Sequence, residues 1–334
     1  MHANNSSAPA TRNAESEIVD NMHPFLRTYK DGRVERLVRY TFVPASEDPG
    51  ATGGVATRDV VVEPATGVSV RLFLSVGAVA TGRRLPLVVY FHGGAFCTGS
   101  AFSEPFHRYA ASLSARAGAL VVSVEHRLAP EHPIPAAYED AWVALRVAAR
   151  VVADGEEGIS IEGMVLLQPF FWGPERLPSE TDRHDGPVFS PEFVDTLWPF
   201  LTGGAAGNDD PRINPPARQA RARSRGREGR GAGPRVPVRA AWLRRGERCC
   251  CREVTLVESK GKDHGFHMYR PECASAVALM DRVAEFINGR ATSSSLIADA
   301  ETEHLHAREG RKTTCRAAFG DGPDKKVCDS PAPE

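Results

Sequence analysis

The sequence predicts an α/β protein built on a mostly parallel central sheet with helices on its faces. Residues 85–91 (LPLVVYF) and 119–125 (ALVVSVE) are nearly continuous apolar runs, which is typical of strands buried on both faces of a parallel sheet. A helical pattern, SEPFHRYAASLSARA, separates the two runs and ends at Gly118, which makes a strand–helix–strand crossover. The 334 residues, 42% of them hydrophobic, favour one large domain over two small ones.

The other elements follow from periodicity. Residues 17–30 carry apolar side chains at helical spacing and predict a short amphipathic helical segment, whereas residues 34–42 and 60–73 alternate between β-branched and polar residues, as in an antiparallel hairpin with one solvent-facing side. Further along the chain we expect a helix at 136–152, a buried strand at 161–167, a last strand at 253–258 and a closing helix at 274–287 capped by Gly289.

Charge and hydropathy exclude some classes of partner. Lysine and arginine total 41 against 42 acidic residues, so nothing in the overall charge predicts nucleic acid or an anionic membrane as partner, and we expect a small molecule instead. No run approaches the roughly 18 apolar residues of a membrane span, and the polar start lacks the layout of a secretory signal. A cytoplasmic protein is therefore expected, with a domain at 17–289 between disordered segments at 1–16 and 290–334. The sequence indicates no oligomeric state.

Seven cysteines do not form the pattern of a disulfide framework. A zinc site built from Cys249, Cys250 and Cys251 with His264 and His267 is chemically conceivable, because thiolates and imidazoles are suitable ligands. Consecutive cysteines point in diverging directions, so we expect no metal and no other cofactor.

Residues 217–252 differ from the rest of the chain, since they contain 12 arginines but neither lysine nor aspartate. A basic segment that binds RNA is one interpretation. Bias toward Arg, Gly, Ala, Pro and Cys is also what GC-rich coding DNA gives in a shifted reading frame, and we favour that interpretation.

The pentapeptide His92-Gly-Gly-Ala-Phe96 follows directly on the predicted strand at 85–91, so its glycines lie at the carboxyl edge of the sheet, where ligands of open α/β sheets bind. Two consecutive glycines let successive backbone N–H groups converge on one point, which can hold the negative oxygen of a tetrahedral intermediate. Gly93 and Gly94 are therefore candidate oxyanion-hole residues. A tight turn without catalytic meaning is the alternative for a lone Gly-Gly pair.

Two further motifs decide between these alternatives. HRLAPEHPIPAAYED at 126–140 and DHGFH at 263–267, together with PFLRTYKDGRVER near the N-terminus, resemble the plant carboxylesterase family of the α/β-hydrolase fold, which is related to hormone-sensitive lipase. The resemblance covers residues 17–173, 186–216 and 253–289. It implies that Gly93 and Gly94 supply oxyanion-hole N–H groups and that His264 is the catalytic histidine, which takes the nucleophile's proton and returns it to the leaving alcohol. It also implies that Asp140 and His126 lie in the packed region beneath the site.

The family's nucleophile is absent. Such hydrolases carry serine in a Gly-x-Ser-x-Gly turn between strand and helix, and the nearest strings here, around Ser69 and Ser160, lack the second glycine. In the family this turn lies between the helix after YEDAW and the strand matching 161–167, where only residues 153–160 remain, so a strand, the turn and a helix are missing, roughly forty residues or more. The catalytic aspartate would fall in the arginine-rich segment, which has none.

These losses lead to three hypotheses. The first is a carboxylic-ester hydrolase by descent, catalytically impaired, in which an altered gene or gene prediction has removed the elbow. The second is a non-catalytic protein that binds a small molecule, similar to the gibberellin receptors related to this family. The third is an arginine-rich nucleic-acid binder. If the sheet closes over the missing strand, we expect 119–125 to pair directly with 161–167.

Overall fold

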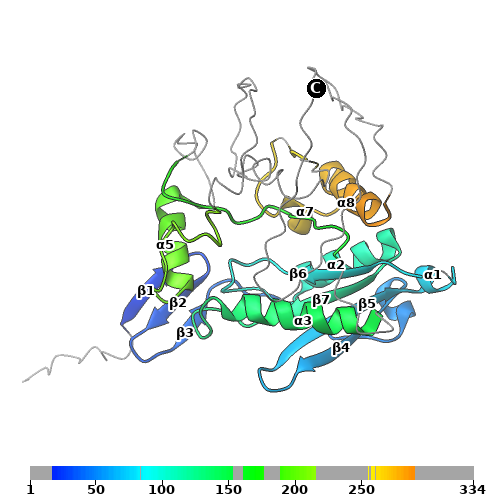
Figure 1. The fold of residues 1–334 in the computed structure, drawn as a ribbon, viewed down its shortest axis with the longest axis horizontal. Helices are drawn as coiled ribbons and strands as arrows, with labels where there is room; N and C mark the ends of the chain where they lie inside the picture. Colours follow the sequence, from blue (N-terminus) through cyan, green and yellow to red (C-terminus); the bar gives the residue numbers. More distant parts are fainter. Residues whose placement is uncertain are drawn as a thin grey trace, which may run out of the picture.

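The computed structural model describes residues 17–82, 84–152, 161–176, 189–215, 255, 257–259 and 261–289 (Figure 1). The expectations for residues 1–16, 153–160, 217–252 and 290–334 lie outside these described residues. Its strands are β1 (Ile18–Met22), β2 (Leu26–Tyr29), β3 (Val34–Arg36), β4 (Val55–Glu63), β5 (Val68–Ser75), β6 (Leu87–Phe91) and β7 (Leu120–Glu125). Its helices are the 3-10 helix η2 (Pro49–Thr52) and the α-helices α1 (Val76–Val79), α2 (Glu104–Ala117), α3 (Ala136–Val152), α5 (Pro191–Leu201), α7 (Phe266–Tyr269) and α8 (Ala274–Ile287).

The central sheet has the strand order β4-β5-β7-β6. Strands β6 and β7 run parallel, with Leu87 opposite Leu120, and α2 connects them, which confirms the predicted crossover. Strands β4 and β5 form an antiparallel hairpin, and β5 pairs antiparallel with β7. Gly118 closes α2 in the left-handed conformation, with φ 60°, because this residue has no side chain to clash there.

Helices cover both faces of this sheet, so the sheet is the middle of three layers (Figure 1). Helices α2 and α8 pack on one face, where Phe73 and Val121 are fully buried. Helix α3 packs on the other face, against Val70 and Val124. The strand expected at 60–73 is interrupted by a turn at 64–67, which joins β4 to β5. The expected solvent-facing side is wrong for β5, which is buried on both faces, whereas residues 58–61 of β4 are exposed.

A second sheet, in the order β1-β2-β3, lies beside α5 (Figure 1). Its residues Met22 and Leu26 share a hydrophobic cluster with Trp198 and Leu201 of α5. The side chain of Trp198 is fully buried, and its indole N–H donates to Asp210 at 3.1 Å. This cluster also contains Cys97, which follows the Gly-Gly turn, so the second sheet and α5 border the predicted site.

The helical segment expected at 17–30 is instead a β-hairpin. Met22 and Leu26 pair across a tight turn in which Phe25 N donates to Met22 O at 2.8 Å. Apolar residues four apart therefore meet across a turn and not along a helix face. Of the strand expected at 34–42, only β3 forms, and Phe42 makes an isolated bridge to Ser103.

Residues 161–167 form no strand, so the expected pairing with 119–125 is also wrong. Strand β7 already has β5 on one side and β6 on the other. In the predicted last strand at 253–258, the described residues 255, 257 and 258 have no strand structure. The helices at 136–152 and 274–287 are confirmed at the predicted bounds, and Gly289 after α8 has φ 66°.

Candidate active site

The Gly93–Gly94 turn begins two residues after β6 ends, at the carboxyl edge of the sheet. Gly94 has φ 121°, and a Cβ atom added to it would lie 2.0 Å from the carbonyl oxygen of Thr98. The carbonyl of Gly94 accepts from the N–H groups of Cys97 and Thr98 at 3.1 and 3.0 Å, so the chain turns back tightly over this residue. No other residue type fits this position without moving the loop.

The backbone N–H groups of Gly93, Gly94 and Ala95 donate to no acceptor within the described part of the chain. Ala95 and Phe96, with φ 51° and 56°, are both held in the left-handed region, which costs free energy, and residues strained in this way cluster at functional sites. The Phe96 carbonyl accepts from Ala129 N at 2.9 Å, which anchors the turn to the segment after β7. Free N–H groups on an anchored turn are what an oxyanion hole requires.

Two stacked histidines support the turn from below. The rings of His92 and His126 lie 4.2 Å apart and 11° from parallel. Burial, followed by the neighbouring His126, lowers the pKa of His92 to about 3, and burial also lowers the pKa of His126. Both rings are therefore neutral near pH 7, and His92 Nδ1 lies 2.8 Å from the carbonyl of Gly93.

Asp140 holds the segment that carries His126. Its carboxylate accepts from the backbone N–H of Arg127 at 2.8 Å and from the guanidinium of the same residue at 2.7 Å. Asp140 is 1% exposed and His126 is 7% exposed. Both lie in the packed region, as the resemblance implies.

His264 lies on the loop before α7, and the side chain of Gln168 holds that loop. Gly265 N donates to Gln168 Oε1 at 2.7 Å, while Gln168 Nε2 donates to the Asp263 carbonyl at 3.5 Å. Partial desolvation lowers the pKa of His264, so the imidazole is a neutral base near pH 7. The role of Gln168 was not predicted from the sequence. The residue adopts the left-handed conformation, with φ 49°, and no glycine marks that position in the sequence.

The ring of His264 lies edge-on to Phe189, with centroids 5.9 Å apart. Phe189 stacks on Phe25 at 5.3 Å and on Phe193 at 5.9 Å. Phe25 and Phe193 pack on the same hydrophobic cluster as Ala95 and Phe96 of the turn. The Gly-Gly turn and His264 therefore border one apolar region, although no described contact joins the ring of His264 to Gly93 or Gly94.

A complete triad is not assembled among the described residues. His264 makes no hydrogen bond to a hydroxyl, a thiol or a carboxylate there, and the adjacent Asp263 pairs with Arg270 at 3.4 Å. Within the same residues no group of three His, Cys, Asp or Glu side chains is arranged to hold a metal ion, and no helix is both long and apolar enough to cross a bilayer. The cysteines at 249–251 lie outside this part of the chain.

Comparison with known proteins agrees with these features. Residues 88–157 match a family described as alpha/beta hydrolase fold. The chain is 32% identical to a probable carboxylesterase of Arabidopsis thaliana, covering 82% of this chain and 100% of that protein. The chain belongs to the plant carboxylesterase family of hormone-sensitive-lipase-like α/β hydrolases. A tuliposide A-converting enzyme of Tulipa gesneriana is 34% identical, covering 86% of this chain and 84% of that enzyme.

Solved structures share the fold. A hormone-sensitive lipase from a metagenome library superposes with a TM-score of 0.54 at 20% identity, covering 74% of this chain and 88% of that one. An esterase of Pyrobaculum calidifontis gives a TM-score of 0.52 at 21% identity, covering 70% of this chain and 85% of that one.

The alignment with the Arabidopsis carboxylesterase contains 330 positions, yet it covers only 82% of 334 residues, which is about 274 residues. About 56 aligned positions of that plant carboxylesterase therefore have no counterpart in this chain.

Proposed function

We propose that this carboxylesterase-family chain retains the oxyanion-binding turn and the histidine base of an ester hydrolase but is catalytically impaired, because it has no serine nucleophile. One observation carries the proposal: the sequence contains no Gly-x-Ser-x-Gly elbow. The aligned positions that the chain lacks support it, since about 56 are more than a strand, a turn and a helix need. The reaction of the intact family, acyl transfer to serine followed by hydrolysis, requires that residue.

The residues that remain have defined roles in this proposal. The N–H groups of Gly93 and Gly94 would bind the oxygen of an ester carbonyl, and the apolar region beside His264 would hold the acyl or alcohol group. Without a serine hydroxyl between the Gly-Gly turn and His264, no covalent acyl-enzyme forms. The loss corresponds to about 10⁶ in kcat, or ~8 kcal/mol of transition-state stabilisation.

Fluorophosphonate labelling tests the proposal directly. The purified chain should show no stoichiometric labelling, and its hydrolysis of p-nitrophenyl butyrate should stay at background and be unchanged in His264→Ala. A plant carboxylesterase with an intact elbow is the positive control. Labelling of one serine that His264→Ala abolishes would overturn the proposal, because it would reveal a nucleophile outside the expected motif.

Binding without turnover is a second candidate, comparable to a gibberellin receptor. It is favoured by the aromatic cluster of Phe25, Phe189 and Phe193, which gives the site an apolar wall while no nucleophile is present. If it holds, p-nitrophenyl butyrate should give saturation-transfer NMR signals without being cleaved, and Phe193→Ala should reduce them. Val61→Ala, at an exposed position on β4, is the matched control. Equal signals in the two variants would refute binding at this site.

A further inference from the structure

A further pocket borders the segment that follows the Gly-Gly turn, because Thr98, which packs against Gly94, is among the residues that line it. It has a volume of about 750 Å³ and is formed by three segments, residues 36–42, 98–102 and 128–132, with Glu125 at the end of β7. Neither Gly93, Gly94 nor His264 lines it. This volume lies in the range of small-molecule sites, and nothing in the proposed ester chemistry uses it.

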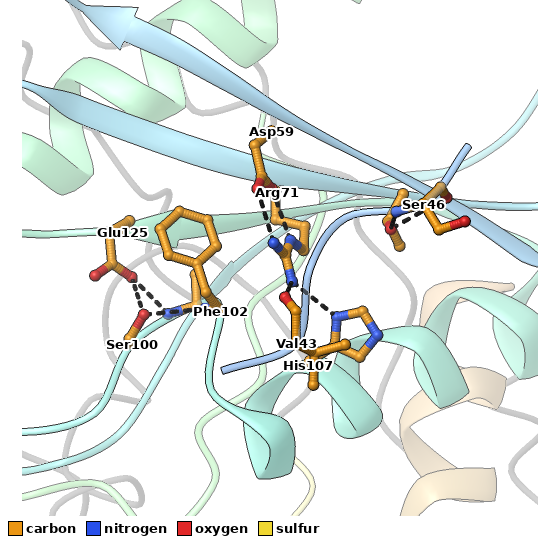
Figure 2. A network of polar contacts seen from close by, with 10 residues as sticks. Val43, Ser46, Asp59, Arg71, Ser100, Phe102, His107 and Glu125 are labelled. Carbon is orange, nitrogen blue, oxygen red and sulfur yellow. Dashed lines mark hydrogen bonds and ion pairs between the residues drawn. The ribbon is translucent and has the colours of Figure 1, made fainter. Parts of the chain in front are cut away.

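Glu125 provides a fixed acceptor in this pocket. Its Oε2 accepts from Ser100 Oγ at 2.9 Å and from the backbone N–H of Ala101 at 2.6 Å, as Figure 2 shows. Its Oε1 has no hydrogen-bond partner among the described residues. The side chain is 26% exposed, and burial raises its pKa. A held carboxylate with one free oxygen is a strong acceptor for ligand hydroxyl groups.

Aromatic side chains also line this pocket. Phe42 is 63% exposed, and Phe102 and Tyr40 also line the pocket. Burial raises the pKa of Tyr40 to about 12, so its phenol remains a hydrogen-bond donor at neutral pH. An exposed phenylalanine beside polar groups offers an apolar face to a ligand.

Backbone contacts fix the chain at Phe42. Phe42 bridges Ser103, and Val43 N donates to the Phe102 carbonyl at 2.9 Å. The Val43 carbonyl in turn accepts from the buried Arg71 at 2.6 Å (Figure 2). The backbone that carries Phe42 and Phe102 is therefore held without a ligand, which reduces the entropy cost of binding.

The charges that line the pocket balance. Arg36 pairs bidentately with Glu131, with distances of 2.8 and 2.7 Å. Arg39 is exposed and makes no ion pair within the described part of the chain, so its charge offsets that of Glu125. A cationic ligand would be repelled by Arg39, and an anionic ligand would be repelled by Glu125. An uncharged ligand with hydroxyl groups can form hydrogen bonds with both side chains.

We propose that this pocket binds the ring of a neutral sugar. The C–H face of a pyranose would cover Phe42, while its hydroxyl groups would donate to Glu125 Oε1 and accept from Arg39. An organic cation would be opposed by Arg39, and a carboxylate by Glu125. The proposal is independent of ester cleavage, because it uses none of the residues assigned to that reaction.

Saturation-transfer NMR with methyl β-D-glucopyranoside, choline and acetate on the full chain tests this. The glucoside should receive saturation at its ring protons, with weaker or no transfer to choline and acetate. Phe42→Ala should weaken binding about tenfold, because the apolar face is lost, and Val61→Ala should leave it unchanged. Glu125→Gln keeps the acceptor for Ser100 and Ala101 but removes the charge, and should also weaken binding.

Three outcomes would overturn the proposal. One is absence of transfer to the glucoside at millimolar concentration in a chain whose circular dichroism shows it folded. Another is equal glucoside binding by Phe42→Ala and Val61→Ala. The third is stronger transfer to choline or acetate, which would assign the pocket to a charged ligand.

Discussion

The ion pair between the buried Arg71 and the partly exposed Asp59 should contribute to stability. The two residues face each other across the β4–β5 hairpin, and two parallel N–H···O bonds of 2.6 and 2.7 Å join them. Arg71 is 2% exposed, and its guanidinium also donates to the Val43 carbonyl and lies over the ring of Phe102. Burial, followed by the charge of Arg71, lowers the pKa of His107, so Nδ1 of the neutral ring can accept from Arg71 at 3.2 Å.

Asp59→Ala leaves this guanidinium buried without a carboxylate. Removing one partner of a fully buried pair costs about 3–5 kcal/mol. The Asp59 side chain is 42% exposed, so water can partly replace it, and we expect a loss of about 2–3 kcal/mol, which is ~5–10 °C in the unfolding midpoint. Urea unfolding followed by circular dichroism measures the loss of free energy, and a thermal scan measures the shift in the unfolding midpoint.

Arg58→Ala is the matched control, because Arg58 precedes Asp59 on the same strand and pairs with Glu47 at 2.8 Å at the surface. Both side chains are about two-thirds exposed, 65% and 67%, so this substitution should leave the midpoint nearly unchanged. Equal midpoints for Asp59→Ala and Arg58→Ala would refute the reasoning, since they would show that the remaining acceptors satisfy Arg71 alone.

Three further perturbations have defined outcomes. Gly94→Ala should destabilise the chain by about 2 kcal/mol or more in the same urea assay, because the added Cβ atom would lie 2.0 Å from the carbonyl oxygen of Thr98. Gly53→Ala is the control: Gly53 has φ 68°, but no atom lies within 4 Å of an added Cβ atom, so the substitution should cost only about 1 kcal/mol. Burial lowers the pKa of His92 from 6.5 to about 3 in the folded chain, so the unfolded chain binds more protons between these pH values. Stability should therefore fall as pH drops from 6.5 toward 3, by up to ~1.4 kcal/mol per pH unit. The urea midpoints at pH 7 and pH 5 should differ less in His92→Phe than in the parent chain, and an unchanged difference would contradict this. Trp198→Ala should cost about 3–5 kcal/mol in thermal unfolding, because the side chain is fully buried. Trp198→Phe should cost about 1 kcal/mol, because only the hydrogen bond to Asp210 is lost. Similar losses in both variants would argue against a packing role for Trp198.

Local signals made several elements predictable. Helices α2, α3 and α8 follow from apolar periodicity, and Gly118 and Gly289 mark the ends of α2 and α8. Strands β6 and β7 follow from their apolar runs. The β1–β2 hairpin was missed, because its apolar residues are spaced as in a helix and the tight turn between them has no glycine.

Burial of charge could not be predicted locally. Arg71 alternates with Val70 and Leu72, which predicts a residue facing water. The face that it occupies is covered by α2 and the segment at 42–46, which come from distant parts of the sequence. The same applies to the site: Gly93, Gly94 and His264 could be named from short motifs, whereas Gln168 and Phe189 act through contacts that no motif carries.

The position of β6 in the sheet bears on the absence of a Gly-x-Ser-x-Gly elbow from the sequence. Within the described sheet, β6 has β7 on one side and no strand on the other. The Gly93–Gly94 turn leaves the carboxyl end of β6, so a serine that acted beside it would need a turn at the carboxyl end of a parallel strand on that free side. About 56 aligned positions that the chain lacks are enough for such a strand, its turn and a helix. The loss of one segment of that length before residue 161 would account for both the free side of β6 and the absence of a Gly-x-Ser-x-Gly elbow from the sequence. The arginine-rich residues 217–252, where the family's aspartate is expected, require a separate change.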